Sequence, residues 1–440
     1  MNRNRLAVLL IVIAIGCGRP RVDRVAEISV GKSVLLASDE TSGLRTGSED
    51  WPNWRGPNTD GIATGAPIPT KWSATENVTW KVQIPGRGHS SPIIVGERIY
   101  IETADEKSET QSIACLDRND GKQIWQTTQH QGQFERAMHR ENTQASSTLA
   151  SDGNRLYGLF LNKGHVVASA LDMDGHEIWK KEIGSFSSKF GYSASPTLYK
   201  SLLLVAADHQ QGGFIAALNC QNGEIVWRKP RPAKSSYASP RVISLDGRDL
   251  MILGGCNRLC GYDPLTGDEL WQANGTAEAG VGTAVEDGGL IFASGGYPEQ
   301  NTLAVDGAGK IVWEKRVKSY VPSMLAFEGS LYLVPDDGVF LCYDARSGAE
   351  KWKKRIGGNF RTSPILSGGH IFTTDMSGKT TVFKAGSSEC EVVAENQLGT
   401  ECFSSPAVSS GQLFLRVADS SNGSRQEWIY CIGKRVAAGG

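Results

Sequence analysis

Seven side chains that could bind a ligand occupy one recurring place in this sequence. Each stands just before a Ser-Ser-Pro segment, or a variant of it, that opens a pair of β-prone stretches. Aromatic rings, an amide and a guanidinium could together hold a planar or anionic ligand. The alternative is a solvated polar channel without a ligand. The candidate residues are His89, Gln144, Tyr192, Tyr237, Tyr320, Arg361 and Phe403.

No catalytic or metal-binding motif accompanies these side chains. The sequence contains no HExxH, GxSxG or Walker pattern, and no Cys/His quartet with zinc spacing. His89, His139 and His209 are far apart in the sequence, and we expect each of them at the surface or in a turn. Asp208 and Glu401 are isolated acids that the sequence does not place as ligands. We therefore predict no catalytic residue and no metal site.

A repeat of eight units must position the candidate residues. Each unit reads as a strand opened by the Ser-Ser-Pro-type segment, a turn, a second strand, a third strand ending near an acid, and a fourth strand. The first unit opens with SSPIIVGERIYIET at 90–103 and the last with SSPAVSSGQLFLRV at 404–417. Eight successive repeats with four strands each predict an all-β, eight-bladed β-propeller of antiparallel blades.

Six of the units contain one hairpin phrase, in which an Asp or Asn opens a turn, a Gly follows, and a Trp comes four residues after the Gly. Asp and Asn side chains favour such turns, and Gly tolerates a positive φ. Because one site does not need a sixfold indole, we interpret the Trp residues as packing between blades. The phrase residues are Asp117, Gly121, Trp125, Asp172, Gly175, Trp179, Asn219, Gly223, Trp227, Asp263, Gly267, Trp271, Asp306, Gly309, Trp313, Asp344, Gly348 and Trp352.

A small residue stands two positions before each of these acids, and a large one stands next to the acid. Cys115 and Cys342 occupy the small position in two units, and we interpret them as core filler. Cys256 and Cys260 flank a short turn and could form a disulfide in an exported protein, or could remain free.

The last two units are degenerate. Lys384 stands where unit seven should have its acid, and unit eight ends at WIYCIGK without a fourth strand. The missing strand is present at the other end of the chain, where VTWKVQIP at 78–85 carries Trp80. We predict that this N-terminal strand completes the last blade, because ring closure protects edge strands.

The N-terminus has the features of an export signal. Arg3 and Arg5 precede the apolar stretch 6–15, which is too short for a comfortable membrane span. Ala14-Ile15-Gly16-Cys17 resembles a bacterial lipobox, which implies lipidation of Cys17; the alternative is an ordinary cleaved signal. The expected organisation is a signal at 1–17, a flexible tether at 18–50, an N-terminal capping segment at 51–78, the propeller at 79–434 and a disordered tail at 435–440.

The capping segment begins with WPNWRGPNTDG at 51–61. Its Trp and Arg side chains offer large flat surfaces between two prolines. We expect the segment to cap one face of the disc; the alternative is a lid over a ligand.

The hairpin phrase and the Ser-Ser-Pro-type strands resemble the pyrroloquinoline quinone (PQQ) repeat, over residues 79–434. The segment at 51–61 is similar to the opening of a subgroup of exported bacterial PQQ-like propellers. One branch of this family holds quinoprotein alcohol and glucose dehydrogenases. Another holds non-catalytic propellers, such as the lipoprotein of the outer-membrane protein assembly machine.

The dehydrogenase branch implies requirements that this sequence does not meet. Those enzymes bind Ca²⁺ beside PQQ through Glu, Asn and Asp, use an Asp base and cover the quinone with a vicinal disulfide. This sequence has no adjacent pair of cysteines and few long insertions. We therefore expect no cofactor and a non-catalytic, envelope-anchored scaffold that binds other envelope proteins. The alternative is a PQQ-dependent alcohol or sugar dehydrogenase that uses PQQ with calcium.

The charge balance excludes one class of partner. The chain has 46 Lys and Arg residues against 47 Asp and Glu residues, and no run of basic residues. A nucleic-acid partner is therefore not expected. The expected location is the periplasm or the outer membrane, with attachment through a lipid at Cys17.

Overall fold

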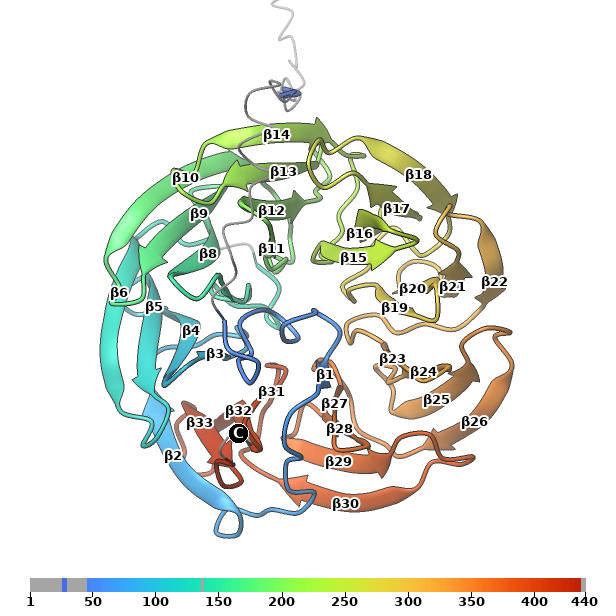
Figure 1. Cartoon of the computed structure of the whole chain (residues 1–440). Coiled ribbons are helices and arrows are strands. Elements are labelled where there is room, and N and C mark those ends of the chain that lie inside the picture. The colour runs from blue at the N-terminus through green and yellow to red at the C-terminus, as the bar shows by residue number, and fades with distance from the viewer. Residues whose placement is uncertain (1–25, 30–45, 136–137, 437–440) are drawn as a thin grey trace, which may run out of the picture.

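The computed structural model describes residues 26–29, 46–135 and 138–436. Their strands form eight sheets arranged in a ring around a central axis (Figure 1). The predicted all-β, eight-bladed propeller is therefore confirmed. The predicted export signal and Cys17 lie outside the described residues. Across the described ranges, no helix combines the length and the apolarity that a bilayer crossing requires.

Blades 1 to 4 follow one another along the chain, and each runs from its innermost to its outermost strand. Blade 1 consists of β3 (Ile93–Val95), β4 (Arg98–Asp105), β5 (Thr110–Asp117) and β6 (Gln123–Gln131). Blade 2 consists of β7 (Ala150–Ser151), β8 (Arg155–Asn162), β9 (His165–Asp172) and β10 (Glu177–Ser185). Blade 3 consists of β11 (Thr197–Tyr199), β12 (Leu202–Ala207), β13 (Phe214–Asn219) and β14 (Ile225–Pro230). Blade 4 consists of β15 (Arg241–Leu245), β16 (Arg248–Gly255), β17 (Arg258–Tyr262) and β18 (Glu269–Asn274).

Blades 5 to 8 complete the ring, and the last two also take strands from the N-terminal part of the chain. Blade 5 consists of β19 (Val285–Asp287), β20 (Leu290–Gly295), β21 (Asn301–Val305) and β22 (Ile311–Lys315). Blade 6 consists of β23 (Leu325–Phe327), β24 (Ser330–Leu333), β25 (Val339–Asp344) and β26 (Glu350–Arg355). Blade 7 consists of β1 (Ile62–Ala63), β27 (Ile365–Ser367), β28 (His370–Thr374), β29 (Lys379–Lys384) and β30 (Val392–Gln397). Blade 8 consists of β31 (Ala407–Ser409), β32 (Gln412–Asp419), β33 (Gln426–Ile432) and β2 (Val78–Ile84).

The N-terminal strand β2 closes the ring, as predicted. It pairs antiparallel with β33, with Trp80 opposite Cys431. Trp80 also contacts blade 1, where its Nε1 donates a hydrogen bond of 2.9 Å to the carbonyl oxygen of Arg118. One strand therefore completes blade 8 and joins it to blade 1.

The repeated phrase forms a contact between neighbouring blades at six of the eight junctions, from blade 8 round to blade 6. Gly267 of blade 4 has a φ of +72°, and a Cβ at this position would lie 2.5 Å from the indole of Trp227 in blade 3. The Trp227 side chain is fully buried, and its Nε1 donates to the carbonyl oxygen of Pro264 at 3.2 Å. The same indole-on-glycine contact is made by the pairs Trp80–Gly121, Trp125–Gly175, Trp179–Gly223, Trp271–Gly309 and Trp313–Gly348.

The small residue of each third strand makes room for the indole. In the antiparallel register of blade 3, Ala217 lies directly opposite Trp227, and in blade 4 Gly261 lies opposite Trp271. A Cβ on Gly261 would come within 2.4 Å of the Trp271 ring. The column of small residues is therefore a consequence of where the tryptophans lie.

A second set of contacts joins the inner strands near the axis. In the Ser-Ser-Pro-type segment of one blade, a backbone N–H donates to the Ser or Thr hydroxyl at the same place in the next blade. We call these residues the hydroxyl belt. In blades 1 to 4, the N–H of Ser91 donates to Thr148, that of Thr148 to Ser195, and that of Ser195 to Ser239. In blades 5 to 8, the N–H of Thr283 donates to Ser323, that of Ser323 to Ser363, and that of Ser363 to Ser405. All six distances between nitrogen and oxygen are 2.8–3.0 Å.

Residues 46–77, which we call the cap, cross one end of the central channel. Trp51 exchanges two backbone hydrogen bonds of 2.9 Å with Ile94 in blade 1. The Arg55 guanidinium, buried beneath the cap, donates to the carbonyl oxygen of Met324 near blade 6 at 2.7 Å. Strand β1 pairs parallel with β27, and Ser409 of blade 8 donates to the cap as well. The cap therefore holds blades on opposite sides of the ring together.

Two local features of the chain were left open or unspecified by the sequence. Cys256 and Cys260 are free, buried thiols. Cys256 lies in the turn with a φ of 57°, whereas Cys260 lies within the ladder opposite Leu253, so the two side chains do not face each other.

Ile28, within the range predicted as a tether, exchanges two backbone hydrogen bonds with Arg228 on β14, the outer strand of blade 3.

We predict that deleting residues 51–85 abolishes cooperative unfolding or causes aggregation. The deletion removes β1 and β2 and exposes the unpaired edge of β33. Size-exclusion chromatography and thermal denaturation measure the effect. Deletion of residues 18–45, which leaves the cap and β2 intact, is the control and should remain monomeric. A monomeric 51–85 deletion with an unchanged Tm would contradict the closure described above.

We predict that Gly267→Ala destabilises the protein more than Gly247→Ala. Both glycines have nearly the same φ, +72° and +73°, but a Cβ on Gly247 would meet no atom within 4 Å. The left-handed conformation alone costs a non-glycine residue about 1–2 kcal/mol. The additional loss of unfolding free energy at Gly267 therefore measures the contact with the indole. This additional loss should shrink in a protein that already carries Trp227→Ala, a substitution that itself lowers the unfolding free energy by about 3–5 kcal/mol. Equal losses in chemical denaturation for the two glycines would refute the packing interpretation.

Candidate functional site

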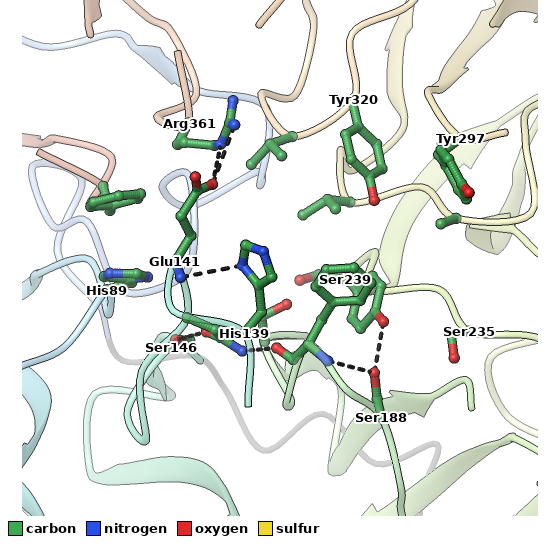
Figure 2. Close-up of a pocket in the computed structure, with 18 of the residues that line it drawn as sticks. His89, His139, Glu141, Ser146, Ser188, Ser235, Ser239, Tyr297, Tyr320 and Arg361 are labelled. Carbon is green, nitrogen blue, oxygen red and sulfur yellow. Dashed lines mark hydrogen bonds and ion pairs between the residues drawn. The ribbon is translucent and has the colours of Figure 1, made fainter. Parts of the chain in front are cut away.

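A pocket of about 710 Å³ lies at the axis, at the end of the channel opposite the cap. This volume falls within the range of about 300–1,000 Å³ that is usual for small-molecule sites. Figure 2 shows side chains from several blades converging on it. The segments that precede the inner strands line the pocket, whereas the cap pairs with inner strands themselves, as Trp51 does with Ile94 and β1 does with β27.

Five of the seven residues proposed from the sequence line this pocket. They are His89, Tyr237, Tyr320, Arg361 and Phe403.

The structure places Gln144 and Tyr192 outside this pocket. The Gln144 amide donates to the carbonyl oxygen of Glu135 at 2.8 Å, and neither residue lines the pocket. Tyr192 is only 5% exposed, and its hydroxyl donates to the carbonyl oxygen of Ala206 at 3.0 Å. In both segments a residue a few positions earlier reaches the pocket instead: Glu141 before blade 2 and Phe190 before blade 3.

Several pocket residues were not proposed from the sequence. His139 and Glu141 belong to the loop HRENTQ, whose polarity was the one signal that could have identified them. Tyr297 lies between the second and third strands of blade 5, so its position in the repeat gave no signal. Trp54 reaches the pocket from the cap and donates from Nε1 to the belt hydroxyl of Thr283 at 3.2 Å.

One wall of the pocket is a stacked pair of rings. The imidazole of His89 lies on the ring of Phe403, with centroids 4.4 Å apart and an interplanar angle of 13°. Burial, reinforced by the nearby Arg87 and Arg416 charges, holds the pKa of His89 well below its ordinary value. The imidazole is therefore uncharged near neutral pH. Among the described residues, no hydrogen-bond partner contacts its Nε2.

The single arginine of the pocket is bound by two carboxylates. Glu141 Oε2 lies 3.3 Å from both Nε and Nη2 of Arg361, and Asp336 Oδ1 lies 3.4 Å from Nη1. Glu141 comes from the loop before blade 2, while Arg361 precedes blade 7, so this ion pair reaches across the mouth (Figure 2). The positive charge of Arg361 is therefore compensated within the protein.

The opposite side of the pocket carries tyrosines. The Tyr237 hydroxyl shares a hydrogen bond of 2.7 Å with Ser188, and its ring meets Phe190 edge-on at 5.9 Å. Burial raises the pKa of both Tyr237 and Tyr320, which keeps these phenols protonated. Tyr297 is 65% exposed, so its ring is open to a ligand.

Comparison with known proteins supports the fold assignment and identifies relatives. The family model described as "Outer membrane protein assembly factor BamB" matches residues 62–170 and 109–354. The BamB of Bordetella pertussis is 23% identical over 409 residues, which cover 90% of this chain and 95% of the relative. The BamB of Yersinia pestis is 23% identical over 385 residues, covering 81% and 90%, respectively.

Solved structures share the fold at low sequence identity. BamB from Moraxella catarrhalis matches with a TM-score of 0.59 at 14% identity, over 82% of this chain and 98% of that one. The quinohemoprotein alcohol dehydrogenase from Comamonas testosteroni matches with a TM-score of 0.62 at 13% identity, over 93% and 84%. These two similarities show the propeller fold and do not separate the two branches. Because the family model covers most of the chain, this protein belongs to the PQQ-like propeller family described as outer membrane protein assembly factor BamB.

Proposed function

We propose that this protein is a non-catalytic, envelope-anchored scaffold that binds other envelope proteins. The observation that carries the proposal is the compensated Arg361, held by Glu141 and Asp336. An anionic cofactor at the axis would have to displace Glu141 before this guanidinium could bind it.

The other residues of the pocket also do not fit PQQ with calcium. PQQ is a tricarboxylate, and binding it requires positive charge or a metal ion. Within the described ranges, no group of three or more His, Cys, Asp or Glu side chains is placed to hold a metal. The sequence contains no adjacent cysteines that could form a vicinal disulfide over the quinone. We therefore assign no redox step to this site.

The architecture supports a role in binding proteins. The closed ring, the hydroxyl belt and the cap connect the blades at the rim, near the axis and across one face. A rigid disc of this kind can bind a partner with little loss of conformational entropy. The relatives from Bordetella pertussis and Yersinia pestis are named as factors of outer-membrane protein assembly, and a related role in the envelope is the one we propose here.

The proposed attachment is a lipid on Cys17. The segment 18–50 would then connect the membrane to the disc. The contact of Ile28 with Arg228 directs this connection past the rim of blade 3.

We predict that the purified mature protein binds PQQ in the presence of Ca²⁺ no more tightly than about 10⁻⁴ M. Calorimetric titration measures the affinity, and a dye-reduction assay with alcohols and sugars measures turnover. Glu141→Gln removes one partner of Arg361 and should bind PQQ more tightly than the unaltered protein does. Micromolar binding with dye reduction in the unaltered protein would overturn the scaffold assignment in favour of a dehydrogenase.

We predict that photo-crosslinking in intact cells joins the protein to specific envelope proteins. A photoreactive amino acid can replace Ile178 or Leu270, which are 43% and 41% exposed on the outer strands of blades 2 and 4, or Tyr297 at the mouth. At least one position should give a discrete adduct, and Cys17→Ser should reduce its yield by releasing the protein from the membrane. Absence of adducts at positions on the rim and at the mouth would count against a protein-binding role.

A further inference from the structure

The central pocket has a chemistry that the scaffold role does not require. Four hydroxyls of the belt line it: Thr148, Ser195, Ser239 and Ser363. Each already accepts a hydrogen bond from a backbone N–H of a neighbouring blade. A hydroxyl can accept and donate at once. Within the described part of the chain, no acceptor is assigned to the hydrogens of these four hydroxyls, so they are available to donate to a ligand.

The charges of the pocket favour an uncharged ligand. Its charged side chains, apart from histidine, are two acids and two bases: Glu141, Glu278, Lys189 and Arg361. Arg361 is bound to Glu141, and Glu278 lies 3.7 Å from Lys234 just outside the pocket. Lys189 lies over the ring of Phe190 at 4.9 Å. A ligand with a net charge would therefore be attracted only weakly, and would have to break existing contacts.

Aromatic rings supply the apolar surface of the pocket. Tyr297 and Tyr320 lie on one side of the pocket and His89 on the other (Figure 2). Tyr237 also lines the pocket, and Phe403 stacks on His89. Ring faces carry partial negative charge and attract the slightly positive C–H groups of a ligand. A ligand that suits this pocket has C–H faces to lie on the rings and several oxygens to accept hydrogen bonds.

We propose that this pocket binds an uncharged saccharide through the tyrosines and the belt hydroxyls. A pyranose ring has a C–H face for stacking and hydroxyl oxygens for the belt donors, and it carries no charge. His89 contributes through its uncharged ring, which is stacked on Phe403. This inference does not rest on the scaffold role, because it is argued only from the side chains that line the pocket.

The test uses calorimetric and tyrosine-fluorescence titrations of the mature protein with cellotriose and with chitotriose. At least one of these trisaccharides should bind saturably with a Kd below about 1 mM. Binding of chitotriose alone would indicate an N-acetylated wall glycan, and binding of both would indicate recognition of the common pyranose ring. An acidic trisaccharide, trigalacturonic acid, should bind more weakly than either.

Variants locate the site. Tyr297→Ala and Tyr320→Ala should each weaken binding by about two- to tenfold, since an aromatic contact is worth roughly 0.5–1.5 kcal/mol. Leu270→Ala, at a similarly accessible position on the rim, is the matched control and should change neither affinity nor Tm. Failure of both uncharged sugars to bind, stronger binding of the acidic sugar, or unchanged affinity in both tyrosine-to-alanine variants would overturn the proposal.

Discussion

The packing of an indole on a glycine of the next blade is the contact on which this ring depends. It explains several sequence features at once. The glycine must have no side chain because the ring of the preceding Trp lies against its Cα, and its positive φ turns the chain into the fourth strand. The residue opposite the Trp in the third strand must be small, as Ala217 is opposite Trp227. Trp271 differs from the others, because its Nε1 has no hydrogen-bond partner among the described residues.

The inner contacts have a different consequence, because they determine what reaches the axis. A hydrogen bond from one blade to a hydroxyl of the next requires Ser or Thr at nearly the same depth in each unit. The belt that joins the blades therefore also surrounds the channel with hydroxyls. Loops with fewer constraints then supply the distinctive groups, such as Glu141 and Tyr297. The framework is repetitive, whereas the chemistry of the pocket comes from segments that vary between blades.

This division explains what the sequence could and could not predict. Repeated local patterns predict the eight units, the closing strand with Trp80, and the small residues that lie opposite the tryptophans in the third strands. The side chains of Tyr192 and Gln144 lie outside the central pocket, because a register position gives the neighbourhood of a side chain but not its direction in a loop. The parallel pairing of β1 with β27 and the burial of Arg55 join segments distant in sequence, and no repeat encodes them. Tyr297 lies in the hairpin between the second and third strands of blade 5, which carries no repeated residue type; in blade 3 the same hairpin brings Gln210 to the pocket.

Ring closure also affects how the chain must be made. Thr79, in the closing strand, bonds to Gly433, which lies 354 residues further along the chain. If the chain crosses a membrane from its N-terminus, β2 emerges early and has no partner until almost the whole protein has followed. Contacts of such large sequence separation form slowly, and unpaired strands are prone to aggregation in the meantime. In that case one short strand, which carries Trp80, has to stay unpaired until almost the whole chain has followed it.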